Sequence, residues 1–197
     1  MQLRLRKTRL SVTFPFAAVV TLMLLVCDSE TVFISLFSSL FHEGGHLFFM
    51  LLFKESPALI CLGAFGMRIE RRSVFLGRKK EALIALGGIA FNFLLMLTGA
   101  AVYLICGSLF GIKLAAVNGF IAAFNMLPAG LLDFGRFLEC IFFNKRDAQR
   151  YLRIISLLTA LAVAAGCVFY NIAIGINVSL IAVSIYIVLI TTYEGVR

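Results

Sequence analysis

Long runs of apolar residues dominate the sequence, and each run has about the length that a helix needs to cross a lipid bilayer. One crossing takes roughly 20 predominantly apolar residues. Six segments fit this requirement: residues 10–27, 31–53, 82–106, 114–143, 152–169 and 176–192. The pattern therefore predicts an all-α polytopic membrane protein with about six transmembrane helices, built as a single integral membrane domain over residues 1–197.

The fourth run is long for one crossing and contains a helix breaker. Pro128, Ala129 and Gly130 interrupt residues 114–143. A proline inside a helix removes a backbone hydrogen bond and clashes with the preceding turn. We predict that the helix breaks here, since a break at membrane depth is tolerated where it is enclosed by protein or lines a hydrated cavity.

Residues 57–80 separate the second and third runs and have a different pattern. Apolar and charged residues alternate over residues 67–70, and Gly63, Gly66 and Gly77 punctuate the segment. Such alternation with a period of two, in a segment bounded by glycines, is typical of short strands. We predict a small membrane-associated β-hairpin at the cytoplasmic surface; the alternative is a basic loop that only fixes the topology.

The composition excludes several classes of protein. Hydrophobic residues make up 61% of the 197 residues and charged residues 14%, whereas a soluble domain has about 45–50% and about 25%. A soluble globule of this size could not bury so much apolar surface. Soluble enzymes, disordered chains and nucleic-acid-binding modules are therefore excluded, and the expected surroundings are the lipid bilayer, with no nucleic-acid partner.

The basic residues predict the orientation of the chain in the membrane. The 18 Lys and Arg residues outnumber the 10 Asp and Glu residues. Nearly all of them fall near the two chain ends, in residues 54–80 and in residues 145–153. A six-span arrangement puts these segments on one side, and short cytoplasmic connections are rich in Lys and Arg. Both termini are therefore expected to face the cytoplasm.

Polar residues inside the apolar runs are the candidates for chemistry, because ionisable groups are costly in a membrane. Both histidines of the chain lie in the string His42-Glu43-Gly44-Gly45-His46, within the second run. Residues four apart share one helix face. His42 and His46 can therefore bind one metal ion while Glu43 reaches a water molecule on that ion.

A catalytic zinc ion takes three protein ligands, so a third ligand must come from another segment. Asp133, which follows the break at Pro128, is the candidate. The alternative is that Asp133 forms a structural ion pair with Arg136, three residues further on. Glu139 lies another three residues on and could take Arg136 instead, which would leave Asp133 for the metal.

Together these segments resemble the site-2 protease family of intramembrane zinc metalloproteases (peptidase family M50), and most of all its short sporulation-type members. The string HEGGH at residues 42–46 is similar to the family's H-E-x-G-H. NMLP at residues 125–128, followed by LDFGR at residues 132–136, is similar to N-x-x-P-x-x-P-L-D-G-G-R. GIAFN at residues 88–92 is similar to G-P-x-x-N.

The resemblance implies roles for particular residues. It implies one zinc ion (Zn2+) per chain, held by His42, His46 and Asp133, with Glu43 as the catalytic base, in a core of about residues 31–143. It also implies that two asparagines bind substrate, namely Asn92 and Asn125.

Three positions depart from the family pattern. Ile89 and Leu131 stand where the family has prolines, and Phe134 stands where it has a glycine. None of the three is an implied metal ligand. The departures therefore concern loop geometry and substrate fit more than the chemistry.

The resemblance also implies a function, regulated intramembrane proteolysis. The expected enzyme is a zinc metalloendopeptidase that hydrolyses membrane-associated substrates within or near the bilayer, as a multi-pass protein of the bacterial cytoplasmic membrane. The expected partner is a membrane-tethered protein substrate such as a pro-sigma or anti-sigma factor, and a regulatory membrane protein is a second candidate. The alternatives are a zinc-binding membrane protein without peptidase activity and a structural bundle that binds no metal.

Overall fold

The computed structural model of the protein describes residues 2–5, 8–26, 28–55, 57–63, 66–71, 77–130, 132–142 and 146–174. This part of the chain is mostly helical and also contains four strands. The chain divides into two compact units, Met1–Ala123 and Phe124–Arg197. The sixth predicted span, residues 176–192, lies outside the described residues, as does Leu131.

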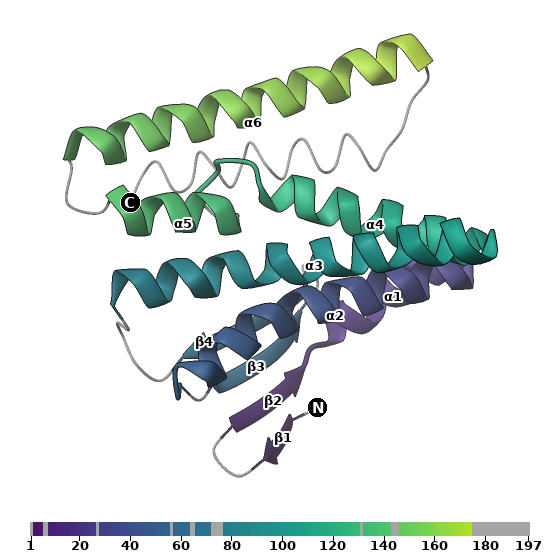
Figure 1. Ribbon diagram of the computed structural model, residues 1–197, viewed down its shortest axis with the longest axis horizontal. Helices are drawn as coiled ribbons and strands as arrows, with labels where there is room; N and C mark the ends of the chain where they lie inside the picture. The colour runs from purple at the N-terminus through teal and green to yellow at the C-terminus, as the bar shows by residue number, and fades with distance from the viewer. Residues whose placement is uncertain are drawn as a thin grey trace. The chain divides into compact units, whose positions relative to one another are not determined.

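Four helices account for most of the first unit (Figure 1). They are α1 (Phe14–Val26), α2 (Ser29–Leu52), α3 (Arg78–Cys106) and α4 (Leu109–Asn125), whose last two residues belong to the second unit. Helices α2 and α3 occupy the second and third predicted runs. Helix α4 begins at Leu109, five residues before the start of the fourth predicted run. Only Gly107 and Ser108 separate it from the end of α3.

The start of the first predicted span is wrong. The sequence pattern begins that span at residue 10, but β2 (Thr8–Val12) occupies residues 10–12 and α1 starts only at Phe14. Before it lies another strand, β1 (Gln2–Leu5). The register of β1 and β2, with Gln2 opposite Ser11, shows that this arm forms a hairpin. Backbone pairing, which an apolarity count does not register, decides the structure of these residues.

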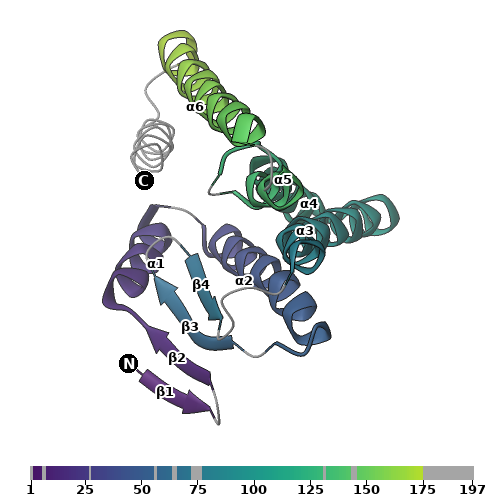
Figure 2. The same ribbon diagram turned by 90° about the vertical axis from the view of Figure 1, so that its left-hand side faces the viewer.

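The strands of the first unit form one sheet with the order β1-β2-β3-β4, and Figures 1 and 2 show the four strands side by side. β3 (Pro57–Gly63) and β4 (Gly66–Arg71) are antiparallel and lie in the segment where the alternating pattern predicts strands. β2 joins them by pairing in parallel with β3. β4 therefore forms one edge of the sheet and contacts α2.

Glycines allow the helices of the first unit to pack closely. A methyl group on Gly45 of α2 would collide with the carbonyl of Gly87 on α3. Further along α3, a methyl group on Gly99 would lie 2.7 Å from the carbonyl oxygen of Gly111 on α4. Small residues at such crossings are common where helices pack in membranes. The two crossings fix α2 and α4 against α3.

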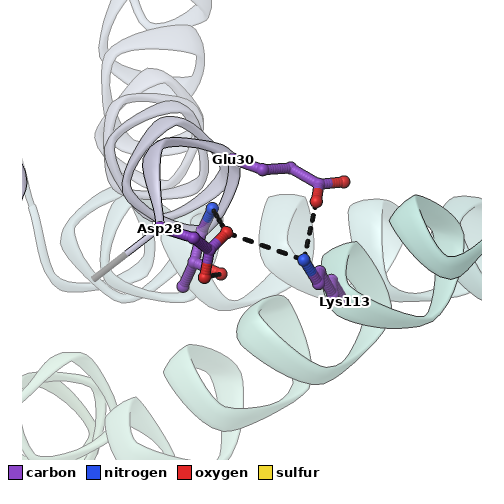
Figure 3. A network of polar contacts seen from close by, with 4 residues as sticks. Asp28, Glu30 and Lys113 are labelled. Atoms are coloured by element: carbon purple, nitrogen blue, oxygen red, sulfur yellow. Dashed lines mark hydrogen bonds and ion pairs between the residues drawn. The ribbon is translucent and has the colours of Figure 1, made fainter.

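A polar cluster joins the start of α2 to α4 (Figure 3). Asp28 caps α2 by accepting a hydrogen bond from the Thr31 backbone N–H at 2.9 Å. Lys113 of α4 donates to Glu30 at 2.6 Å and lies 3.6 Å from Asp28. Lys113 is distant in the sequence from Asp28 and Glu30, and the fold brings the three side chains together.

The second unit contains α5 (Asp133–Phe142) and α6 (Arg146–Ile174), which contact each other. The break predicted inside the fourth run is present, because α4 ends at Asn125 and α5 begins at Asp133. Proline at position 128 explains the interruption. α6 extends beyond both ends of the fifth predicted run, residues 152–169.

Two described helices, Arg78–Cys106 and Arg150–Phe169, are long and apolar enough to cross a bilayer by length and composition. Phe16–Leu25 and Leu109–Asn125 are apolar but shorter. Large apolar side chains on these helices are exposed. On α3 they include Leu94, Leu97, Leu104 and Ile105. These features indicate a membrane protein, and six crossings remain a prediction from the sequence.

Candidate metal centre

The two histidines share one face of α2, as their spacing predicts. The imidazole rings of His42 and His46 lie edge to face with their centroids 5.0 Å apart. The Nδ1 atom of His46 lies 2.7 Å from the carbonyl oxygen of Ile84 on α3. Since a carbonyl only accepts, Nδ1 carries the proton, and this tautomer leaves Nε2 of His46 with a lone pair for a metal ion.

Gly88 of α3 lies where the two imidazoles converge. A methyl group at this position would lie 2.6 Å from Nε2 of His46 and 2.7 Å from Nε2 of His42. Both Nε2 atoms therefore approach the same point on α3, and only a residue without a side chain leaves space there. Two imidazole nitrogens directed to one small space are an arrangement that suits a shared metal ion.

Asp133 is held by the turn that follows the helix break. It is the first residue of α5, and its side chain is buried. The backbone N–H of Leu132 donates to the carbonyl of Ala129 at 2.9 Å, and Gly135 packs so tightly on Ala129 that a methyl group would collide with it. From α6, the buried Ser156 hydroxyl accepts a hydrogen bond from the Gly130 N–H at 3.3 Å.

His42, His46 and Asp133 form a group that could hold a metal ion. Each offers one atom that a metal ion can bind, an imidazole nitrogen or a carboxylate oxygen. Two imidazole nitrogens and one carboxylate oxygen are a donor set that zinc accepts, with a fourth position left for water or substrate. The residues present therefore fit the zinc ion that the resemblance implies.

The surroundings of Asp133 favour the metal-ligand interpretation over the ion pair with Arg136. The Asp133 side chain is buried, whereas Arg136 and Glu139 are exposed. An exposed arginine contributes little as a structural partner because water and salt screen the interaction. A buried carboxylate is costly unless hydrogen bonds or a cation offset its charge.

The other predicted site residues are spread over three helices. Glu43 is half-buried next to His42 on α2, and Asn125 is the half-buried last residue of α4. Asn92 lies on α3, one turn after Gly88, and is fully buried. Of the departures, Ile89 is buried on α3. Phe134 stacks on Phe137, with ring centroids 5.6 Å apart.

Two features near the centre were not predicted from the sequence. Gly88 belongs to the motif at residues 88–92 but had no predicted role of its own, although it is the residue that faces both imidazoles. The buried side chain of Asn118 on α4 donates a hydrogen bond to Ser38 on α2 at 2.8 Å, one turn before His42. Ser38 and Asn118 lie in apolar runs, and only the polarity of their side chains could have singled them out.

The arrangement of the chain is similar to that of a solved protease. A site-2 protease from Methanocaldococcus jannaschii matches 98% of this chain, and 94% of its own chain is covered, with a TM-score of 0.66 and 19% sequence identity. The chain shares the fold of a site-2 protease.

The sequence comparisons add no further relative. No protein-family model matches the chain, and no curated protein matches it. At 19% identity the likeness to the site-2 protease concerns the fold. What the chain does must therefore be argued from its own residues.

Proposed function

We propose that this chain is an intramembrane zinc metalloprotease that cleaves membrane-associated proteins within or beside the bilayer. The observation that carries the proposal is the convergence of His42 and His46 on Gly88. This convergence occurs in a chain that shares the fold of a site-2 protease. The group formed with Asp133 supports zinc as the metal.

His42, His46 and Asp133 would hold the zinc ion. A zinc ion in such a site polarises the scissile carbonyl and lowers the pKa of a coordinated water to about 7. The carboxylate of Asp133 supplies one negative charge to this ligand set. The hydrogen bond from His46 to the Ile84 carbonyl fixes the ring and its tautomer for this purpose.

Glu43 is the proposed general base. It follows His42 directly on α2 and is half-buried, so its side chain is not sealed from solvent. In hydrolysis Glu43 takes the proton of the attacking water and then delivers a proton to the leaving amine nitrogen. A single carboxylate can do both, because its proton is gained in the first step and lost in the second.

A membrane-spanning substrate must unwind before it can be cut, because its carbonyls are hydrogen-bonded inside its own helix. β4 is an edge strand of the described sheet and offers a binding mode for the unwound segment, since an extended peptide can add to an edge strand through backbone hydrogen bonds. β4 contacts α2, the helix that carries the histidines. Asn125, at the end of α4, is a second proposed contact for the substrate backbone.

The proposed substrates are membrane-tethered regulators such as a pro-sigma or anti-sigma factor, of a bacterial cytoplasmic membrane. A regulatory membrane protein is a further proposed partner. These assignments are supported by the resemblance of the sequence motifs to the site-2 protease family, and especially to its sporulation-type members. A tagged single-span protein carrying such a regulator's membrane segment is therefore the first substrate to test.

The test measures zinc content and cleavage for four proteins reconstituted in liposomes with tagged single-span substrates. We expect Glu43→Gln to keep zinc and to lose cleavage by about 10²–10⁴-fold, because only proton transfer is removed. Asp133→Asn is expected to lose more zinc affinity than the roughly 10–100-fold typical of an outer-sphere partner. Glu30→Gln, at the exposed start of the same helix, is the matched control and should behave as wild type.

Three results would contradict the proposal in different ways. Full turnover by Glu43→Gln would remove the assigned base. Zinc binding without cleavage by the wild-type protein would favour a non-proteolytic zinc protein. Absence of bound zinc in the wild-type protein would leave a structural bundle.

A further inference from the structure

Four polar side chains of the first unit are buried among its helices. Ser38, Asn92 and Asn118 are completely buried, and His42 is nearly so. They come from α2, α3 and α4. Buried polar groups are costly unless their hydrogen bonds are satisfied, so their grouping requires an explanation.

The contacts between α2 and α3 determine which residues face one another. His46 lies against Ile84, and His42 lies against Gly88. Each contact steps back four residues on α2 and forward four on α3, as expected for antiparallel helices. The next step pairs Ser38 with Asn92. The contact of Phe41 with Phe91, at 5.2 Å between ring centroids, lies at the same level.

Asn118 completes this layer from α4. Its Nδ2 atom donates to Ser38 Oγ at 2.8 Å and to its own helix, at the Leu114 carbonyl, at 2.9 Å. Its Oδ1 atom has no hydrogen-bond partner among the described residues, and neither Oδ1 nor Nδ2 of Asn92 has one. Two side-chain amides thus have three unsatisfied polar atoms in one buried layer.

We infer that the layer of Ser38, Asn92 and Asn118 holds an ordered water molecule one helical turn from the metal ligand His42. The water donates to Oδ1 of Asn92 and Oδ1 of Asn118 and accepts from Nδ2 of Asn92. Buried waters typically have two to four polar partners, and this layer supplies that number. A larger ligand is excluded because neither amide has any exposed surface.

The inference gives Asn92 a role that differs from contact with substrate. Ser38 and His42 lie on one face of α2, and Gly88 and Asn92 on one face of α3, so the water belongs to the outer surroundings of the imidazole pair. It stiffens the three helices around the metal ligands. The inference does not depend on peptidase activity, and its test does not use it.

The first measurement is a structure of the zinc-loaded wild-type chain in lipid, at a resolution that shows ordered solvent. We expect one water within 3.5 Å of the amides of both Asn92 and Asn118. A dry layer, or a direct hydrogen bond between the two amides, would overturn the inference. This measurement needs no variant and so does not depend on how a substitution affects folding.

The second measurement is the thermal unfolding of N92L, N118L and the double variant. If the water is present, N92L leaves Oδ1 of Asn118 without its partner, and the Tm falls by several degrees. The double variant should lose less than the sum of the two single losses, because both act through one water. N118L also removes the hydrogen bond from Asn118 to Ser38. The single variant N118L and the double variant both lack this bond, so its loss cancels in the comparison.

Thr98→Val provides the control for this cycle. Thr98 lies on α3 but is exposed, and its hydroxyl bonds only to the Leu94 carbonyl of its own helix. N92L combined with T98V should therefore be additive. A rise in Tm for N92L would mean that the amide is buried dry, and strict additivity of N92L with N118L would mean that no water joins them; either result overturns the inference.

Discussion

Gly88 is the residue whose lack of a side chain matters most to the candidate metal centre. A methyl group there would lie 2.6–2.7 Å from Nε2 of both histidines, closer than real contacts allow. We predict that Gly88→Ala loses bound zinc and, with it, cleavage. Metal analysis of the purified protein measures the loss.

Gly44→Ala is the matched control for this prediction. Gly44 lies in the same short string as the histidines, but a methyl group there meets no atom within 4 Å. This variant should therefore keep zinc. Equal zinc contents for Gly88→Ala and Gly44→Ala would show that the two imidazoles do not use the space at Gly88.

Asp28 gives a prediction for pH. Hydrogen bonds from the Thr31 hydroxyl and the Thr31 backbone N–H hold the pKa of the Asp28 carboxyl below its ordinary value of 3.8, and the charge of Lys113 acts in the same direction. A carboxyl with a lower pKa in the folded state stabilises the fold above its unfolded pKa. That stabilisation is lost as the pH falls through the folded pKa.

Wild-type protein should therefore exceed Asp28→Asn in stability by a constant amount from neutral pH down to about pH 4, the region of the unfolded carboxyl pKa. The difference should shrink at lower pH, where both side chains are uncharged. Asparagine is a suitable replacement because it also caps helices. Thermal unfolding of both proteins between about pH 3 and 7 tests this, and a difference that does not change with pH would refute it.

The sequence singles out its candidate site residues because ionisable side chains are rare in apolar runs. His42, Glu43, His46 and Asp133 are costly in apolar runs, so each attracts a functional interpretation. Ser38 and Asn118 carry no charge, so the sequence alone does not mark them as functional. Their hydrogen bond depends on how α2 and α4 pack, which the local pattern does not contain.

At the scale of elements, the pattern predicts α2, α3 and the break before Asp133 because apolar length and proline act locally. It misses β1 and the parallel pairing of β2 with β3, between residues such as Leu10 and Ile60 that lie far apart in sequence. Strand pairing of this kind is set by register between distant segments. The apolar residues just before α1 therefore do not predict that they pair as a strand with β3.

The proposed binding of substrate along the edge strand β4 can be tested with proline. Backbone N–H groups of a strand point alternately to its two sides, so one of Arg68 and Ile69 directs its N–H toward β3 and the other toward the open edge. Proline is tolerated on an edge when the lost N–H faces outward. We predict that one of Arg68→Pro and Ile69→Pro keeps zinc and stability but loses substrate cleavage.

The other variant should lose stability, because it breaks the ladder with β3. Leu3→Pro in β1, the opposite edge of the sheet, is the control and should not affect cleavage. If the proline variant that remains stable and retains zinc cleaves as fast as wild type, substrate does not bind as a strand on β4.

At the scale of the whole molecule, the distribution of charge predicts how the chain lies in the membrane. Asp28 and Glu30 at the start of α2 meet Lys113 near the start of α4, a small cluster of mixed charge. The start of α3 carries the consecutive basic residues Arg78, Lys79 and Lys80. Because basic segments stay on the cytoplasmic side, the start of α3 should be cytoplasmic and the start of α2 should face the opposite side.

Single cysteines at Ser29 and Lys79 test this orientation, since both positions are exposed. The five native cysteines are first replaced, and a membrane-impermeant maleimide is applied to intact cells. Ser29→Cys should react at once, and Lys79→Cys only after the membrane is permeabilised. The same order of labelling would place the hairpin of β3 and β4, with the proposed substrate-binding edge, on the cytoplasmic side. The reverse order would require the sheet and the proposed cleavage site to open to the outside, against the charge distribution.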